Sequence, residues 1–139
     1  MKLGELLLEN GQINEEQLAK ALDEQKINWK KLGEILVDLG YVDDATLTDM
    51  IAKQTSAERV DLKNTYIDAK AARRIPKEFA KKYTVIPIYE KDGSLYVAMS
   101  DPRNIYALDD LRLLTQTPIH PLIAPASEIE RAIEIYYSQ

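Results

Sequence analysis

One segment of this 139-residue chain occurs twice, and the duplication constrains the fold more than any other feature of the sequence. The residues Lys2-Leu3-Gly4-Glu5-Leu6-Leu7 return as Lys31-Leu32-Gly33-Glu34-Ile35-Leu36. When residues 2–25 are aligned with residues 31–54, eight of the 24 pairs are identical, whereas chance would give roughly one or two. The N-terminal part therefore contains two copies of one structural unit, and two equivalent copies suit a ligand with two equivalent halves.

Each copy predicts two helices joined by a short turn. Apolar residues recur at helical spacing on both sides of the turn. Gly11 stands where a left-handed helix stop is expected, and Asn14 with Gln17 forms the sequence pattern of a capping box. Gly40 and Asp43 occupy the same places in the second copy. Residues 2–54 are therefore expected to form four helices, packed as two related hairpins.

After about residue 57 the pattern changes to short strands that alternate with helices. We expect an edge strand at 60–62, followed by a helix from residue 68 that Pro76 interrupts. A strand at 85–89, which Pro87 confines to a sheet edge or a bulge, is joined by a hairpin turn at 91–94 to a strand at 95–99. A helix with Leu108, Leu111 and Leu114 on one face, a strand at 119–123 and a final helix capped by Ser127 complete the chain. The sequence thus predicts an α+β fold, in which a helical subdomain at 1–57 precedes a small mixed α/β subdomain at 58–139.

Composition excludes several classes of function. The chain has no cysteine, which rules out disulfides and thiolate metal sites and is compatible with a cytoplasmic location. Residues 1–57 carry 6 lysines and 11 acidic residues, and residues 58–139 carry 12 basic and 12 acidic residues, so long nucleic acid is not an expected partner. No apolar run reaches the roughly 18 residues that cross a bilayer, and we expect no membrane insertion.

The sequence also lacks the pattern of an assembled catalytic site. It contains neither G-x-x-x-x-G-K-[ST] nor G-x-G-x-x-G. The single histidine, His120, has no cysteine or second histidine with which to share a metal, and we interpret it as structural. The acidic pairs at 43–44 and 109–110 lie near predicted helix N-termini, where they complement the helix dipole. We therefore predict no catalytic residue, no metal site, no cofactor and no enzymatic activity.

The duplicated pattern resembles the MshEN domain, the N-terminal domain of type II secretion and type IV pilus assembly ATPases. The family pattern is approximately R-L-G-x-x-L, a hydrophobic pair and L-x-x-x-L-x-x-Q, given twice. The second half of the chain is also similar to the family, through Ile75-Pro76-x-x-Phe79-Ala80, Met99-Ser100-Asp101-Pro102 and Ala107-Leu108-Asp109-Asp110-Leu111. This resemblance covers essentially the whole chain. It implies a domain that binds cyclic di-GMP, which is two guanylates closed into a ring with approximate twofold symmetry.

Several residues of the chain have the chemical groups that could contact such a ligand. Gly4 and Gly33 lack a Cβ at two predicted helix starts, so a ligand can approach the backbone N–H groups there. Gln25 and Gln54 carry amides that can pair with a base edge. Asp101, whose counterpart in the family contributes to the ligand site, can accept two hydrogen bonds from the N1–H and N2–H₂ groups of guanine. The remaining expected contacts are one cation and three apolar side chains from each copy: Lys2, Leu3, Leu6 and Leu7, then Lys31, Leu32, Ile35 and Leu36.

The chain departs from the family at the first position of each copy, where Lys2 and Lys31 replace the usual arginine. Both lysines can reach O6 and N7 of guanine. Lysine lacks the planar fork with which arginine stacks and binds bidentately. We therefore expect binding of cyclic di-GMP that is retained but weaker.

Several of these residues also have a simpler structural interpretation. The leucines form a core whether or not a ligand binds, and lysines by themselves are solvated surface charges. Asp101 can cap a helix that starts with Pro102, and Trp29 can be a packing anchor between the two hairpins. Gly4 and Gly33 are harder to explain by packing alone, because glycine early in a helix lowers stability relative to alanine.

Two functions remain open at the level of sequence. In the first, the domain senses cyclic di-GMP and alters the behaviour of an attached or separate assembly ATPase. In the alternative, it binds no nucleotide and docks the ATPase onto an inner-membrane assembly protein. The presence of both copies favours the first function, because a docking domain needs only one intact face.

Overall fold

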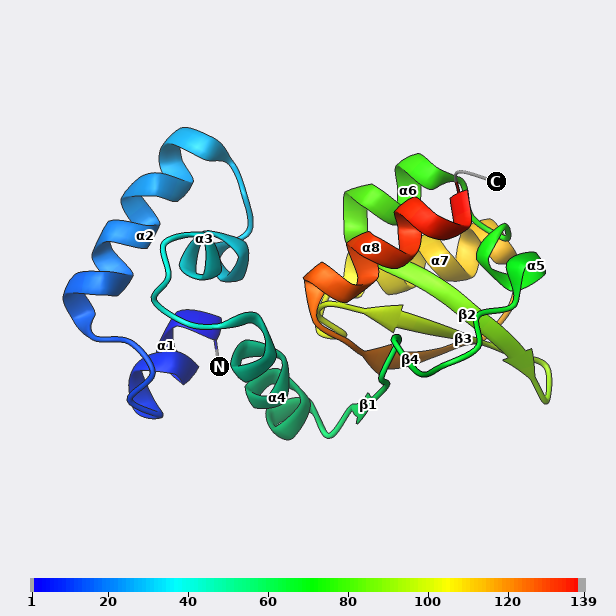
Figure 1. Ribbon diagram of the computed structural model, residues 1–139, viewed down its shortest axis with the longest axis horizontal. Coiled ribbons are helices and arrows are strands. Elements are labelled where there is room, and N and C mark those ends of the chain that lie inside the picture. The colour runs from blue at the N-terminus through cyan, green and yellow to red at the C-terminus, as the bar shows by residue number, and fades with distance from the viewer. Residues whose placement is uncertain (1, 138–139) are drawn as a thin grey trace. The chain divides into compact units, whose positions relative to one another are not determined.

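The computed structural model describes residues 2–137 and divides into two compact units, Met1–Leu47 and Thr48–Gln139. Helices make up the first unit, and the second unit contains a four-stranded mixed sheet with helices (Figure 1). The expected α+β class, with helices preceding the sheet, is confirmed. The division falls within a helix at Leu47/Thr48, whereas the sequence pattern changes after residue 57.

Four helices occupy the duplicated region, as predicted: α1 (Leu3–Glu9), α2 (Glu15–Asn28), α3 (Leu32–Asp38) and α4 (Asp44–Thr55). The first and third helices have 7 residues each. Two residues after the last residue of each helix stands a glycine in the left-handed region, with φ of +70° at Gly11 and +77° at Gly40. A Cβ is unfavourable at such a φ, and this is the reason that the chain has glycine at these two stops.

The turns that follow these stops are closed by capping side chains. Asn14 and Gln17 form the predicted capping box, in which each side chain accepts a hydrogen bond from the other residue's backbone N–H, at 2.8 and 3.0 Å. Asp43 accepts a hydrogen bond from the Thr46 N–H at 3.1 Å directly before α4. This bond lowers the pKa of the Asp43 carboxyl, because it stabilises the charged form.

Trp29, which the sequence suggests as an anchor between hairpins, is 88% exposed, and that interpretation is wrong. The residue ends α2 in the left-handed conformation, with φ of 59°, and its N–H donates to the Gln25 carbonyl at 3.0 Å. The turn that stops the helix therefore places the indole in solvent. The core of the first unit is formed instead by Leu7, Ile13, Ala21, Ile35, Leu36, Val42 and Leu47.

The second unit is built on a sheet with the strand order β1-β4-β3-β2. Its strands are β1 (Glu58–Arg59), β2 (Val85–Lys91), β3 (Ser94–Met99) and β4 (Ile119–Ile123). The outer β2 is antiparallel to β3, and β4 runs parallel to both β3 and β1. The expected edge strand at 60–62 lies instead at β1, because the parallel pairing with β4 selects the segment two residues earlier.

The β2–β3 hairpin agrees with the sequence in both of its special features. Asp92 and Gly93 have φ of 53° and 80°, the two positive values that a tight hairpin turn requires. The pairing shifts between Pro87 and Tyr89. Proline has no N–H to donate to a ladder, and Pro87 therefore sits beside a bulge on an outer strand.

Four helices accompany the sheet: α5 (Ala69–Ala72), α6 (Lys77–Tyr83), α7 (Ile105–Thr115) and α8 (Ala126–Tyr137). Pro76 divides the first two, as predicted, and is the N-cap of α6. Ser127 does not cap α8, because the helix already begins at Ala126. Leu114 does not join Leu111 in the core; it is 48% exposed, because the buried face of α7 follows i, i+4 spacing through residues 107, 111 and 115.

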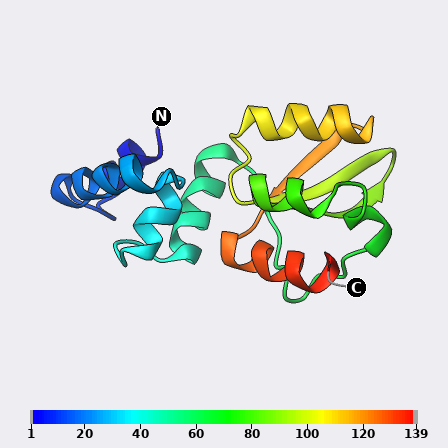
Figure 2. The same ribbon diagram turned by 90° about the horizontal axis from the view of Figure 1, so that it is seen from above.

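The core of the second unit joins the sheet to these helices. Figure 2 shows α6 and α8 side by side, and Lys77 and Lys81 of α6 both form ion pairs with Glu134 of α8, at 3.7 and 3.5 Å. The largest fully buried side chains of this unit are Ile75, Ile86, Ile88, Leu95, Met99, Leu111, Leu122, Ile123, Ile129 and Ile133.

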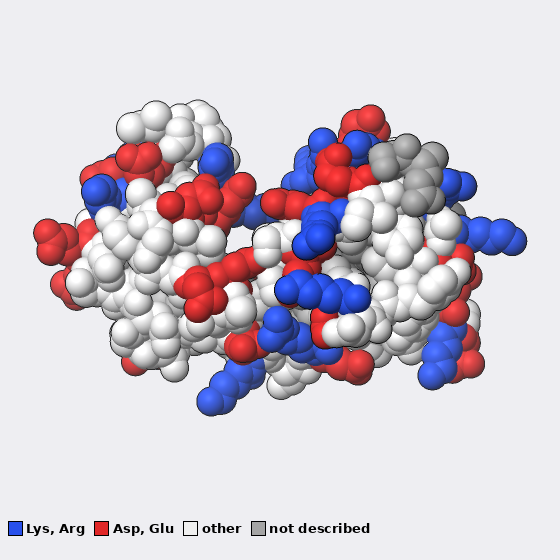
Figure 3. Space-filling view, viewed as in Figure 1, with Lys and Arg blue, Asp and Glu red and all other residues white. Residues whose placement is uncertain are grey.

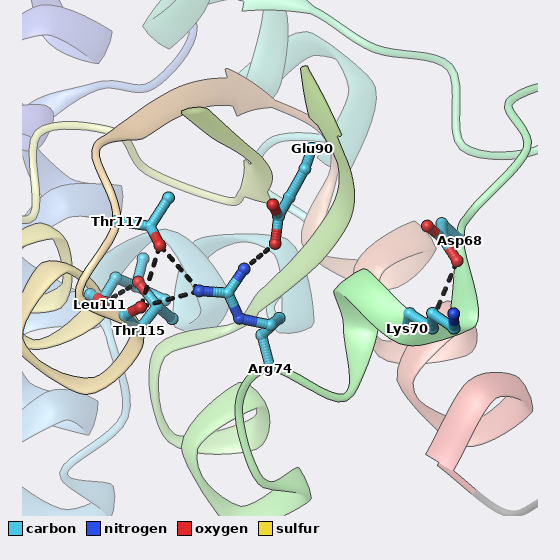
Figure 4. A network of polar contacts seen from close by, with 7 residues as sticks. All are labelled: Asp68, Lys70, Arg74, Glu90, Leu111, Thr115 and Thr117. Atoms are coloured by element: carbon cyan, nitrogen blue, oxygen red, sulfur yellow. Dashed lines mark hydrogen bonds and ion pairs between the residues drawn. The ribbon is translucent and has the colours of Figure 1, made fainter. Parts of the chain in front are cut away.

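Arg74 links three segments of the second unit through an ion pair and two hydrogen bonds (Figure 4). Arg74, which follows α5, forms an ion pair with Glu90 of β2. Its Nη2 donates to the Thr115 carbonyl and to Thr117 Oγ1, both at 2.7 Å. The guanidinium thus supplies partners to polar groups at the end of α7 and in the turn that leads into β4.

Tyr137, the last helical residue, makes the stability of the fold decrease at high pH. Its hydroxyl donates to the Ala72 carbonyl and, at 3.1 Å, to the Ile75 carbonyl. Burial raises the pKa of Tyr137 from 10.0 to about 12. A raised pKa in the folded state means that the stabilisation is complete below pH 10 and is lost as the pH rises through 12.

We expect Tyr137→Phe to flatten this loss. The free energy of unfolding of the unaltered protein should fall more steeply than that of the variant between pH 10 and 12, because only the unaltered protein must ionise this phenol on unfolding. Urea titrations across that range measure the difference. Tyr106→Phe is the matched control, since Tyr106 is 80% exposed. Equal slopes for all three proteins would contradict the prediction.

Within residues 2–137 no helix combines the length and the apolar character needed to cross a bilayer. On the face shown in Figure 3, Lys and Arg side chains are interspersed with Asp and Glu side chains, and no continuous basic field is visible there. The charges on that face thus agree with the sequence, which contains no strongly basic segment.

Candidate functional site

The two predicted lysines occupy equivalent positions in the first unit. Lys2 is the N-cap of α1 and Lys31 is the N-cap of α3, with extended backbone at φ/ψ of −73°/153° and −66°/144°. Each carbonyl accepts the first intrahelical hydrogen bond, from Leu6 N at 3.0 Å and from Ile35 N at 3.1 Å. Both side chains are exposed. The fold therefore presents two cations in the same local geometry, one from each copy of the repeat.

The two glycines that follow the lysines are buried among leucines. A Cβ on Gly4 would lie 2.9 Å from Leu18 Cδ1, and a Cβ on Gly33 would lie 3.0 Å from Leu47 Cδ2. A Cβ at either position would require these leucine methyl groups to shift, so packing gives both glycines a role that the sequence alone did not show. Their contact with a ligand stays a prediction.

A second set of contacts crosses from one copy to the other. A Cβ on Gly4, in the first copy, would lie 3.6 Å from Leu32 Cδ2 of the second copy. A Cβ on Gly33, in the second copy, would lie 3.2 Å from Leu3 Cδ2 of the first. The glycine of each copy thus faces the leucine that precedes the glycine of the other. This exchange is the contact pattern expected of an internal pseudo-twofold arrangement.

The apolar residues predicted at the site fall into two groups. Leu7 and Leu36 have no exposed surface, and Ile35 is 3% exposed, so these three side chains form the core of the first unit. Leu3, Leu6 and Leu32 are half-buried and retain surface that a ligand can reach. Packing is the main role of the first group, as the structural interpretation of the leucines expected.

The two closing glutamines make different contacts. Gln25 is half-buried, and its Nε2 donates to the Lys30 carbonyl at 3.0 Å, directly before Lys31. Gln54 is exposed at the end of α4, and its Oε1 accepts a hydrogen bond from Arg103 Nη1 at 3.3 Å. The sequence equivalence of these residues does not extend to their partners.

Asp101 does not cap α7, and this part of its structural interpretation is wrong. The cap is Asn104, whose Oδ1 accepts from Ala107 N at 3.1 Å. Asp101 instead shapes the preceding turn, because its Oδ1 accepts the Arg103 N–H at 3.0 Å and its carbonyl accepts the Asn104 N–H at 3.2 Å. The carboxylate is thereby held three residues before the cap and remains about one third exposed, at 32%.

Sequence reasoning missed Arg103, the residue that joins the two predicted contacts of the second unit. Its Nε donates to Asp101 Oδ1 at 2.9 Å and its Nη2 to Asp101 Oδ2 at 2.8 Å, while Nη1 reaches Gln54. The hydrogen bonds to Asp101 raise the pKa of the guanidinium above its ordinary value. The available signal was a cation two residues after the carboxylate that was expected to read guanine.

The acidic pair at 109–110 lies in the middle of α7 and not at its N-terminus, where the sequence placed it. Asp110 accepts a hydrogen bond from the Tyr83 hydroxyl at 2.5 Å, which raises the pKa of Tyr83. His120 stacks on Tyr96, with ring centroids 4.3 Å apart. No group of three or more His, Cys, Asp or Glu side chains suited to a metal occurs among residues 2–137.

Comparison with known proteins gives the class to which this fold belongs. The MshEN domain model matches residues 55–139, which is more than half of the chain. This chain belongs to the MshEN domain family, the N-terminal domain of type IV pilus and type II secretion ATPases.

Individual relatives support the assignment over nearly the full length. The chain is 39% identical over 138 residues to the type IV pilus assembly ATPase PilB of Myxococcus xanthus, and 27% identical over 144 residues to type II secretion system protein E of Xanthomonas campestris pv. campestris. The alignments cover 99% of this chain but only 24% and 25% of those proteins. The chain therefore spans about a quarter of the length of these ATPases.

Solved structures extend the similarity to the helical half. A structure of MshE with cdg, the abbreviation of cyclic di-GMP, matches with a TM-score of 0.78 and 30% identity, over 99% of each chain. The N-terminal domain of XpsE matches with a TM-score of 0.80 and 27% identity, over 95% of this chain and 91% of that one.

Proposed function

We propose that this chain is a cyclic di-GMP sensor domain that acts on a type IV pilus or type II secretion assembly ATPase, either attached to it or separate, in the cytoplasm. Lys2 and Lys31 bind the two guanylate halves through their anionic and O6/N7 acceptor groups. The half-buried leucines of both copies offer apolar surface to the purine faces. Gln25, Gln54 and Asp101 supply polar contacts to base edges, and the contacts of Gly4 and Gly33 with the ligand belong to the same proposal.

The observation that carries this proposal is the equivalence of the two lysines. Two N-cap lysines with matching backbone angles, on helices of equal length, provide two copies of one cationic position. The reciprocal packing of Gly4 with Leu32 and of Gly33 with Leu3 relates the copies by an approximate twofold operation. A cyclic dinucleotide has the matching property, since its halves are chemically identical.

The similar structure of MshE with cdg supports the choice of ligand. The similarity covers both halves of the chain at 30% identity, including the duplicated helices that the MshEN model does not match. The polar contact most specific for guanine is the Asp101 carboxylate, because its two oxygens can accept from N1–H and N2–H₂ together.

Isothermal titration of the domain with cyclic di-GMP tests this function. We expect saturable binding of one cyclic dinucleotide, with selectivity over cyclic di-AMP and GTP. Cyclic di-AMP has the same ring and charge but lacks the guanine edge, and GTP has the base without the second half. Absence of both heat and a thermal shift at millimolar cyclic di-GMP would overturn the proposal.

Docking without a nucleotide is the second candidate, and one feature of the second unit favours it. Helix α7 exposes Ile105, Tyr106 and Leu113, whose side chains are 67%, 80% and 69% accessible. Apolar side chains gathered on one helix are a common component of protein interfaces. In this alternative the helix contacts an inner-membrane assembly protein. This alternative predicts that the unaltered domain binds no cyclic di-GMP and that Tyr106→Ser/Leu113→Ser loses ATPase recruitment. Saturable cyclic di-GMP binding, or recruitment that survives both substitutions, would contradict it.

A further inference from the structure

We propose that Arg103 is an internal competitor of guanine: it occupies the Asp101 carboxylate in the free domain and must leave before a guanine edge can bind there. The inference rests on the proposed function, in which Asp101 reads guanine. It assigns to this chain a residue that lowers affinity by holding the recognition group, and it predicts that removal of the arginine side chain tightens binding.

The geometry of the pair supports competition. Arg103 donates from Nε and Nη2 to the two different oxygens of Asp101, at 2.9 and 2.8 Å. Guanine presents the same pattern of two adjacent N–H donors, N1–H and N2–H₂, to a carboxylate. The guanidinium and the guanine edge therefore require the same pair of acceptors in the same in-plane arrangement, and both cannot occupy it together.

A further contact holds the arginine in the blocking position. Nη1 of Arg103 donates to Gln54 Oε1 at 3.3 Å, so the guanidinium also occupies the amide of a second predicted base contact. One side chain thus covers the two polar groups that the second unit is proposed to offer to the ligand.

The pair is nevertheless accessible to a competing ligand. The side chains of Arg103 and Asp101 are 27% and 32% exposed, so solvent and a ligand can reach the pair. The turn does not depend on the guanidinium, because the Arg103 backbone N–H bonds to Asp101 Oδ1 at 3.0 Å. Asp101 thus keeps one of its orienting contacts when the arginine side chain swings away.

The consequence for affinity follows from the population of the open state. If only a fraction of molecules has the carboxylate free, the apparent Kd equals the intrinsic Kd divided by that fraction. A single bidentate pair at a partly exposed position favours the closed state by a factor of about five, so relief of the competition should lower the apparent Kd about fivefold.

Arg103→Thr tests the proposal directly. Threonine preserves the backbone N–H that bonds to Asp101 and removes the fork. The variant loses one positive charge, which by itself weakens the binding of an anionic ligand. Arg112→Thr is therefore the matched control, because Arg112 is an exposed arginine of the same unit that pairs with Asp109 at 3.3 Å. Cyclic di-GMP should bind Arg103→Thr about fivefold more tightly than Arg112→Thr in isothermal titration.

A base analogue tests whether Arg103 competes with guanine at the Asp101 carboxylate. Cyclic di-inosine monophosphate retains N1–H and O6 but lacks the N2 amino group, so it cannot reproduce the fork. The gain in affinity from Arg103→Thr should be smaller for this analogue than for cyclic di-GMP. Equal gains for both ligands would indicate that the arginine acts through charge or access, and would overturn the competition at Asp101.

The remaining outcomes separate this inference from the function on which it rests. Cyclic di-GMP binding by the unaltered domain with no gain in Arg103→Thr overturns the inference alone, and a loss of affinity would make Arg103 a ligand contact. No binding by the unaltered domain or by either variant overturns the proposed function as well. Should thermal melting show that Arg103→Thr is unfolded, Arg103→Lys, which keeps the charge without the fork, must bind cyclic di-GMP more tightly than the unaltered domain for the inference to stand.

Discussion

Replacement of both N-cap lysines, Lys2→Ala/Lys31→Ala, is expected to weaken cyclic di-GMP binding by about 100-fold or more. Each lysine can make a charge-assisted hydrogen bond to the ligand, and loss of one such bond reduces affinity about tenfold or more. The single variants should lose similar factors, because the two lysines have matching backbone geometry at helices of equal length. Isothermal titration and displacement of a fluorescent cyclic di-GMP analogue measure the change.

Two controls make this experiment decisive. Lys20→Ala/Lys26→Ala removes the same charge from exposed positions of α2 and should change affinity little. Lys2→Arg/Lys31→Arg restores the residue usual in the family and should bind at least as tightly as the unaltered domain, since arginine can bind bidentately. A double-alanine variant that binds as well as the unaltered domain would show that both lysines are only surface charges.

Leu7→Ala and Leu36→Ala are each expected to lower the free energy of unfolding by about 3 kcal/mol. Both side chains have no exposed surface, and alanine at either position leaves a cavity among the helices of the first unit. The two losses should be similar, because the residues occupy equivalent positions in α1 and α3. Urea denaturation followed by circular dichroism gives the comparison.

A partly exposed leucine provides the reference for these core variants. Leu22 of α2 is 40% exposed, and Leu22→Ala should lower the free energy of unfolding by less than about 1 kcal/mol. If Leu36→Ala were no more destabilising than Leu22→Ala, the first unit would not depend on the core described here. If Leu7→Ala and Leu36→Ala differed strongly, the duplication would have lost its energetic equivalence.

The packing of the two glycines links the fold of the first unit to its proposed ligand. Gly4 faces Leu18 of its own copy and Leu32 of the other, and Gly33 faces Leu47 and Leu3. Between the copies, a Cβ on Gly33 would lie tightly against Leu3 at 3.2 Å, whereas a Cβ on Gly4 would lie at an ordinary contact distance of 3.6 Å from Leu32. In the proposed function the glycines contact the ligand, and their packing also places the two equivalent N-cap lysines in one unit.

Much of the fold could be predicted from the sequence, because the relevant signals are local. The stops at Gly11 and Gly40 depend on a left-handed φ that glycine readily adopts, and the capping box depends on residues three positions apart. The β2–β3 hairpin follows from Asp92 and Gly93 for the same reason. Each of these features is decided by a residue and its immediate neighbours.

The wrong predictions concern features that depend on more than the local sequence pattern. Strand β1 has two residues whose position is set by pairing with β4, more than sixty residues later in the sequence, and the local pattern placed the strand at 60–62. Leu114 has the spacing of a core residue, yet the core contacts α7 along another line of residues. Trp29 is large and apolar, but it lies at a left-handed helix stop and points into solvent.

For the candidate site, too, some features follow from residue order and others only from the tertiary structure. By itself the sequence determined that two equivalent units exist, that each begins with a lysine, and that a carboxylate stands before the helix at 105–115, because a repeat and a turn are properties of residue order. Only the tertiary structure decided that leucines from both copies fill the space beside Gly4 and Gly33, and that Arg103 occupies Asp101 and Gln54. The contact of Arg103 with Gln54 and the contacts between the two copies join residues far apart in the chain, and the pairing of Arg103 with Asp101 depends on the conformation of the turn between them.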